Sequence, residues 1–192
     1  MALAFSSVCC GNAFGQEPWD QFLRKPDKNS FVVLQSAISE SAQSCGWGSP
    51  NNESVAPARK RTMLFRWIAD GNESAFRAGL LVRRCFDGGD LEDFHRSTGL
   101  YFQAETKSLL EIAKEEGLSA SDVKSMLTIL PSNTVDDIDA AIRVVRLRIA
   151  LLSGVRDRTL RQIVKIGLSA LEEEEAGLQR IKAETEGTSK KR

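Results

Sequence analysis

Several residue types on which enzymes often depend are scarce in this chain of 192 residues. It has one histidine, one tyrosine and four cysteines. A single histidine cannot supply the two Glu-x-x-His motifs of a di-iron carboxylate site, and the sequence has no C-x-x-C pair of the kind that a zinc knuckle needs. Phosphate-binding loops, dinucleotide-binding glycine motifs and G-x-S-x-G nucleophile elbows are also missing from the sequence. We therefore expect no cofactor and no metal, and the sequence favours a function other than catalysis.

Long apolar runs and an excess of charge of one sign are missing too. The chain has 26 Lys and Arg against 26 Asp and Glu, so its formal net charge is zero. This balance argues against a protein whose whole surface binds a polyanion. No apolar run approaches the roughly 18 residues of a membrane-spanning helix. With 42% hydrophobic residues, the chain is long enough for one globular domain and rather short for two.

The first 15 residues have the composition of a secretory signal peptide. Residues 2–10 are apolar or small, and Glu17 is the first charged residue. Small residues at Ala13 and Gly15 predict cleavage near Gln16, which would place the protein in a secreted or periplasmic location. No basic residue precedes the apolar stretch. An apolar N-terminal segment on a cytoplasmic protein is the alternative.

Removal of residues 1–15 would leave two cysteines, Cys45 and Cys85. An even pair in an oxidising compartment predicts a disulfide bond. A bond that closes a loop of about 40 residues would stabilise the fold by about 4 kcal/mol in the chain-entropy model. Two unrelated buried thiols in a cytoplasmic protein are the alternative.

The apolar residues recur at helical spacing along most of the chain, and no alternating strand pattern is present. We predict an all-α fold of about seven helices in a single domain, arranged as a bundle or a stack of helical hairpins. An irregular lead-in over 16–30 precedes an all-helical domain over 31–185, and 186–192 form a polar tail. Within the domain, 44–60 is a long loop and 91–97 a short helix that stops before Gly99. We expect hairpins from 103–117 with 119–131 and from 134–153 with 157–184.

The long loop 44–60 holds the candidate binding residues. Trp47 lies between Gly46 and Gly48, two residues after Cys45. Its side chain would either pack beside the disulfide or make an exposed contact with a partner. Loops of this length are usually functional or disordered. We therefore predict a protein-binding site at Trp47, Gly46, Gly48 and Asn51.

A second polar patch, over 87–96, surrounds the only histidine. Glu92 and His95 have the i, i+3 spacing of helical metal ligands, and Asp90 and Asp93 lie beside them. His95, Glu92 and Asp93 are weak catalytic candidates, which leaves a hydrolase or metal-dependent enzyme as an alternative function. Helix capping beside a surface histidine is the simpler interpretation.

Residues 141–165 hold six arginines and one lysine against one aspartate. On a helical wheel the apolar residues Ile142, Val145 and Ile149 form one stripe, with Arg146 and Arg148 on either side of it. We expect snorkelling arginines that residues 172–175 neutralise across an antiparallel hairpin, and pairing of Asp139 with Arg143. A cytoplasmic, nucleic-acid-binding regulatory domain is the other alternative, although nucleic acid is the less favoured partner.

Together these patterns favour a secreted or periplasmic helical domain without catalytic activity. It would act by binding a protein partner, whose identity the sequence leaves unknown. An inhibitor or immunity-like protein fits this size and compartment by analogy.

Overall fold

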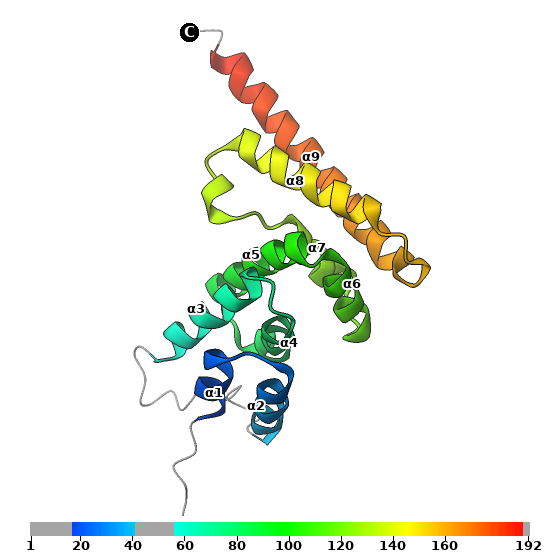
Figure 1. Ribbon diagram of the computed structural model, residues 1–192. Coiled ribbons are helices and arrows are strands. Elements are labelled where there is room, and N and C mark those ends of the chain that lie inside the picture. Colours follow the sequence, from blue (N-terminus) through cyan, green and yellow to red (C-terminus); the bar gives the residue numbers. More distant parts are fainter. Residues whose placement is uncertain (1–16, 41–55, 190–192) are drawn as a thin grey trace, which may run out of the picture.

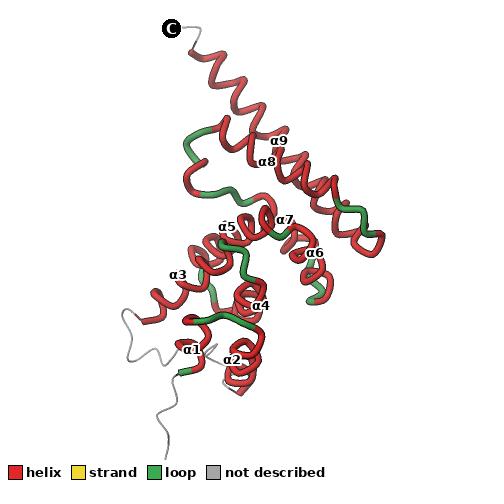
Figure 2. The backbone as a smooth tube through the Cα atoms, in the orientation of Figure 1, coloured by secondary structure: helices red, strands yellow, loops and turns green. Residues whose placement is uncertain are grey.

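The computed structural model describes residues 17–40 and 56–189, and every regular element in these ranges is helical (Figure 2). The helices are α1 (Pro18–Arg24), α2 (Lys28–Glu40), α3 (Ala56–Ala69), α4 (Glu73–Val82), α5 (Gly88–Ala104), α6 (Thr106–Glu115), α7 (Ala120–Thr128), α8 (Ile138–Gly154) and α9 (Arg161–Ser189), with three 3-10 turns, η2 (Arg83–Cys85), η3 (Ser132–Thr134) and η4 (Arg158–Leu160). The all-α prediction is confirmed. The predicted number of seven is too low, because these ranges hold nine α-helices. None of the helices in these ranges is both long and apolar enough to cross a membrane.

The prediction that residues 16–30 are irregular is wrong, because helix α1 lies within this segment. Pro18 is pre-organised for the first turn of a helix, and Trp19, Phe22 and Leu23 are buried. The Trp67 Nε1 on α3 donates a hydrogen bond of 3.0 Å to the Leu23 carbonyl. Tertiary burial of three large apolar residues therefore stabilises a helix of only seven residues.

Two further boundaries differ from the predictions because of tertiary packing. Helix α3 begins at Ala56, inside the predicted loop 44–60. Helix α5 continues through Gly99 to Ala104, although a helix ending before Gly99 was predicted. Gly99 lies against the guanidinium of Arg148, which leaves no space for a side chain. The glycine therefore permits a close helix contact and does not end the helix.

The first five helices pack around an aromatic core at one end of the molecule (Figure 1). Phe76 stacks on Tyr101 with ring centroids 4.8 Å apart, and Phe94 lies beside both Phe65 and Phe86. The Asn72 side chain caps α4 by accepting a 2.8 Å hydrogen bond from the Ala75 N–H. Buried aromatic rings thus join α3, α4 and α5.

Helices α8 and α9 form the predicted antiparallel hairpin at the other end (Figure 1). Helix α9 also covers α7, and Gly167 lies at this junction close to Leu127 and Leu152. The predicted hairpin of α6 with α7 is not a main contact of the structure, because α7 packs chiefly on α9 and α5. Helix α9 therefore makes the larger part of the contact between the C-terminal hairpin and the rest of the fold, and α8 adds to it through Arg148.

Candidate functional site

The predicted loop site and part of the predicted disulfide lie outside the described residues. Gly46, Trp47, Gly48 and Asn51 belong to the segment 41–55, as does Cys45. Cys85 ends the 3-10 turn η2. The Cys45–Cys85 bond and the binding role of the loop therefore stay predictions. The same holds for the signal peptide over 1–15.

The acidic residues of the 87–96 patch are engaged with arginines or with the backbone. Asp87 caps α5 by accepting a 2.9 Å hydrogen bond from the Asp90 N–H. Asp90 instead pairs with Arg61 at 2.8 Å. Glu92 forms an ion pair with Arg96. Among the described residues, no group of three or more histidine, cysteine or acidic side chains could hold a metal ion.

His95 lies apart from these carboxylates and is buried, contrary to the simpler interpretation of a surface histidine. Only 8% of its surface is exposed. Burial lowers the pKa of His95, the charge of Asp122 opposes this shift and the charge of Arg83 adds to it. Arg83 and Asp122 form their own ion pair at 3.2 Å. His95 is thus a buried side chain of α5 near the Arg83–Asp122 ion pair, and its position favours a packing role.

Arg148 departs most from the sequence prediction, since it is fully buried and does not snorkel. Its Nη1 donates hydrogen bonds of 2.6 Å to the Leu127 carbonyl and 3.0 Å to the Ile129 carbonyl, at the end of α7. Its Nε and Nη2 have no partner in the described structure. Burial lowers the pKa of Arg148 to about 10. A cation near the carboxyl end of a helix is electrostatically favourable, so Arg148 connects α8 to α7.

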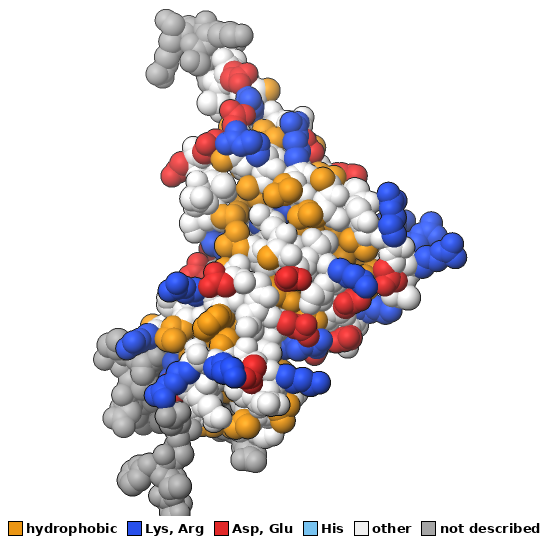
Figure 3. All heavy atoms as spheres, in the orientation of Figure 1, with side chains coloured by type: hydrophobic (Ala, Val, Ile, Leu, Met, Phe, Trp, Pro, Cys, Tyr) orange, Lys and Arg blue, Asp and Glu red, His pale blue; other side chains and the backbone are white. Residues whose placement is uncertain are grey.

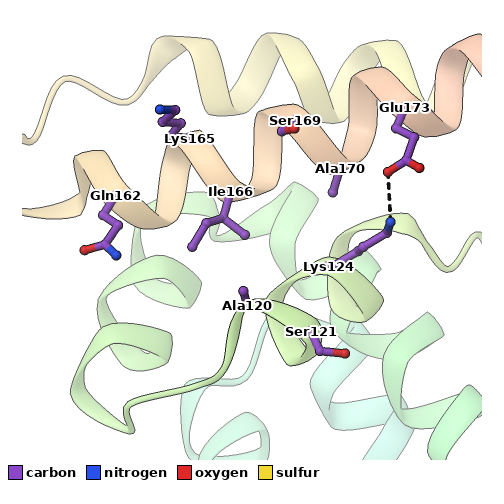
Figure 4. A pocket seen from close by; sticks show the side chains of 9 residues that line it. All are labelled: Ala120, Ser121, Lys124, Gln162, Lys165, Ile166, Ser169, Ala170 and Glu173. Carbon is purple, nitrogen blue, oxygen red and sulfur yellow. Dashed lines mark hydrogen bonds and ion pairs between the residues drawn. The ribbon is translucent and has the colours of Figure 1, made fainter.

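A groove that could take a ligand runs between α7 and α9 (Figure 4). It encloses about 660 Å³, and Ala120, Ile166 and Ala170 contribute apolar surface to it. Figure 4 shows Ser121 and Lys124 on the α7 side, opposite Ser169 and Glu173 on α9. An ion pair of 2.9 Å between Lys124 and Glu173 crosses one end.

A second cavity of about 260 Å³ continues this groove towards α6. Gln162 and Ile166 line both cavities, so the two are adjacent along α9. Leu118, Val123 and Ile163 add apolar lining, and no aromatic side chain lines either cavity. We call the two cavities together the α7–α9 groove. Its apolar floor can bind aliphatic side chains, and its polar edges can orient them.

The basic residues of 141–165 divide into two groups. Arg146 is neutralised by Glu175 at 2.7 Å, which confirms the prediction that residues 172–175 face these arginines. Asp139 pairs closely with Lys182, at 2.6 Å, and Arg143 with Asp137, at 3.8 Å. The predicted attraction between Asp139 and Arg143 is weaker: Lys182 lowers the pKa of Asp139 most, and the charge of Arg143 adds to that shift. A second group forms no ion pair within the described residues and is exposed around the α8–α9 turn: Arg156, Arg158, Arg161 and Lys165. Figure 3 shows Lys and Arg side chains gathered at this end.

No family model matches this sequence, and neither a curated protein nor a solved structure matches it. Function must therefore be argued from the site. Sequence reasoning did not find the α7–α9 groove, because its lining residues on the two helices are far apart in the sequence, with Lys124 and Gln162 the nearest pair. One available signal was the small residues Ala120 and Ala170, which line the groove from the two helices.

Proposed function

We propose that this chain is a non-enzymatic helical domain that binds a protein partner through the α7–α9 groove. An acidic, amphipathic segment of the partner would occupy the groove. The observation that carries the proposal is the combination of an apolar floor with unpaired basic residues at one end. We also propose that the protein is secreted or periplasmic and has an inhibitor or immunity-like role, as the sequence favours. The helices would form a single folded domain.

The apolar floor supports binding of a helical or extended peptide. Ile163 and Ile166 lie on successive positions of one face of α9, and Val123 approaches from α7. A groove between two helices with aliphatic lining is a common acceptor for the apolar face of an amphipathic segment. Burial of such a face removes apolar surface from water on both partners.

The charges support an acidic occupant. Lys165 lines the larger cavity and Lys114 the smaller one. Arg161 and Arg158 follow at the same end of α9 and of η4, and both are exposed. Complementary charges at the edge of an interface accelerate association and select against the wrong partner. Single-stranded nucleic acid is the weaker candidate, because no aromatic side chain lines the groove for base stacking.

Site-specific photocrosslinking in cells that naturally produce the chain tests this proposal. Benzoylphenylalanine would replace Ser121 or Ser169, which are exposed at the groove, and in a control it would replace Ser153, exposed on α8. We expect a protein crosslink from Ser121 and Ser169 that Ser153 does not give. Mass spectrometry would place the crosslink within an acidic segment. Equal crosslinking from all three positions, or a crosslink to nucleic acid, would contradict the proposal.

A charge reversal with a matched control completes the test. Lys165→Glu should weaken the crosslink and the affinity for the identified segment by about threefold or more, since each exposed pair contributes up to about 1 kcal/mol. Lys28→Glu makes the same change at an exposed position on α2, remote from the groove in sequence and fold, and should have no effect. Equal loss in both variants would show that net charge alone, and not the groove, sets the affinity.

A further inference from the structure

Helix α8 carries a second apolar stripe, on a different face from the one that packs on α9. Its members are spaced by four, three and four residues: Ala140, Val144, Leu147 and Leu151. Leu147 is 48% exposed, and the other three are partly buried. Arg143 and Ala150 border the stripe on its solvent side, and both are exposed. Figure 3 shows hydrophobic side chains on the molecular surface over this hairpin.

The four-three-four spacing is that of the seam positions in a coiled coil, at which the side chains of one helix fit between those of a second. Helix α9 occupies the neighbouring face of α8, through Val145 and Leu152. We infer that the stripe pairs with the same stripe of a second copy of this chain. The two α8 helices would run antiparallel about a two-fold axis that passes between Val145 and Arg146.

The sizes of the side chains favour this antiparallel register. It places Ala140 opposite Leu151 of the second copy and Val144 opposite Leu147 of the second copy. Each layer then combines a smaller residue with a larger one, which fills the space between helices evenly. A parallel pair would place Ala140 on Ala140 and Leu147 on Leu147, which leaves a gap in one layer and crowds another.

The charges at the two ends of α8 are complementary in the same register. Asp136 and Asp137 precede the helix, whereas Arg156 and Arg158 follow it. Asp136, Arg156 and Arg158 form no ion pair within the part of the chain that the structure describes. Antiparallel pairing brings the acidic end of one copy to the basic end of the other, whereas parallel pairing brings like charges together. This complementarity selects a second copy as the occupant.

Sedimentation equilibrium of the full chain, with free thiols alkylated, tests the inference. A seam of four layers is at the small end of stable interfaces, so we expect a dimer with a dissociation constant of about 1–100 µM. Leu147→Glu places a carboxylate in the seam and should weaken the dimer at least about tenfold. Ile181→Glu alters an equally exposed apolar residue on α9, at 54% exposure, and should leave the dimer unchanged. Circular dichroism would verify that both variants fold.

A charge exchange tests the register. Asp136→Arg and Arg156→Asp should each weaken the dimer by about two- to fivefold, and the double variant should restore it. A wild-type chain that stays monomeric up to about 500 µM would overturn the inference. So would equal effects of Leu147→Glu and Ile181→Glu, or a failure of the double variant to recover.

Discussion

Substitution of Gly99 by alanine offers a sharp test of the buried Arg148 contact. A β-carbon at position 99 would lie 2.2 Å from the Arg148 Nη2 and 2.9 Å from its Cζ. The guanidinium cannot easily move away from this β-carbon, because its Nη1 donates hydrogen bonds to the Leu127 and Ile129 carbonyls. Alanine in a helix interior is otherwise favoured over glycine by about 1 kcal/mol. The sign of the effect therefore depends on whether the arginine contacts survive.

We expect them to be lost. Two charge-assisted hydrogen bonds contribute about 1.5–3 kcal/mol each, and the helix propensity of alanine offsets only part of that. Gly99→Ala should therefore lower the free energy of unfolding by about 2–5 kcal/mol. Urea unfolding followed by circular dichroism at 222 nm would measure this change. The variant should also exchange the amide protons at the end of α7 faster than the wild type.

Two comparisons make the result interpretable. Gly177→Ala in α9 adds a β-carbon that meets only the end of Arg180, at 3.9 Å, so it should stabilise the protein by about 0.5–1 kcal/mol. In an Arg148→Met background the guanidinium is gone, and Gly99→Ala should no longer destabilise. A Gly99→Ala variant as stable as the wild type, alongside the expected result at Gly177, would refute the proposed role of Arg148.

Three other predictions follow from the fold. The free energy of unfolding should fall as the pH drops below the ordinary histidine pKa of 6.5, because burial lowers the pKa of His95 in the folded protein and the unfolded chain takes up the proton first. His95→Gln should remove this dependence of stability on pH, and parallel stability profiles of the variant and the wild type would contradict the prediction. Gly79→Ala would place a β-carbon 2.6 Å from the Phe94 ring and 3.0 Å from Ile68, and urea titration should show a loss of about 1–2 kcal/mol. The intact mass of a chain cleaved near Gln16 should rise by two hydrogens on reduction if Cys45 and Cys85 are bonded, whereas two alkylatable thiols in that unreduced cleaved chain, or four in an uncleaved chain, would exclude the bond.

The helix content was predictable because most apolar positions repeat at helical spacing. The helix caps at Asn72 and Ser119 are local in the same way, since each side chain accepts a hydrogen bond from the backbone N–H three residues on. The antiparallel pairing of α8 with α9 followed from long stripes on neighbouring segments. These features depend on residues close together in the sequence, which is why pattern alone identified them.

Features that depend on distant residues were not predictable in this way. Helix α1 is held by contacts with α3, and the burial of Arg148 depends on the absence of a side chain at Gly99. The sequence alone does not distinguish a glycine that ends a helix from a glycine that allows another helix to pack closely. The α7–α9 groove likewise exists only because α9 folds back over α7, which no local pattern specifies.

The arrangement of the C-terminal hairpin has a consequence for the order of folding. Helices α8 and α9 follow each other closely, with η4 between them, so their contacts close a short loop and lose little chain entropy. Contacts between α1 and α3 instead close over residues 25–55, which slows their formation. We therefore expect the α8–α9 hairpin to nucleate folding, with α7 docking next and the N-terminal helices last. Substitutions at Val145 or Leu171 would then slow folding, whereas substitutions at Phe22 would mainly accelerate unfolding.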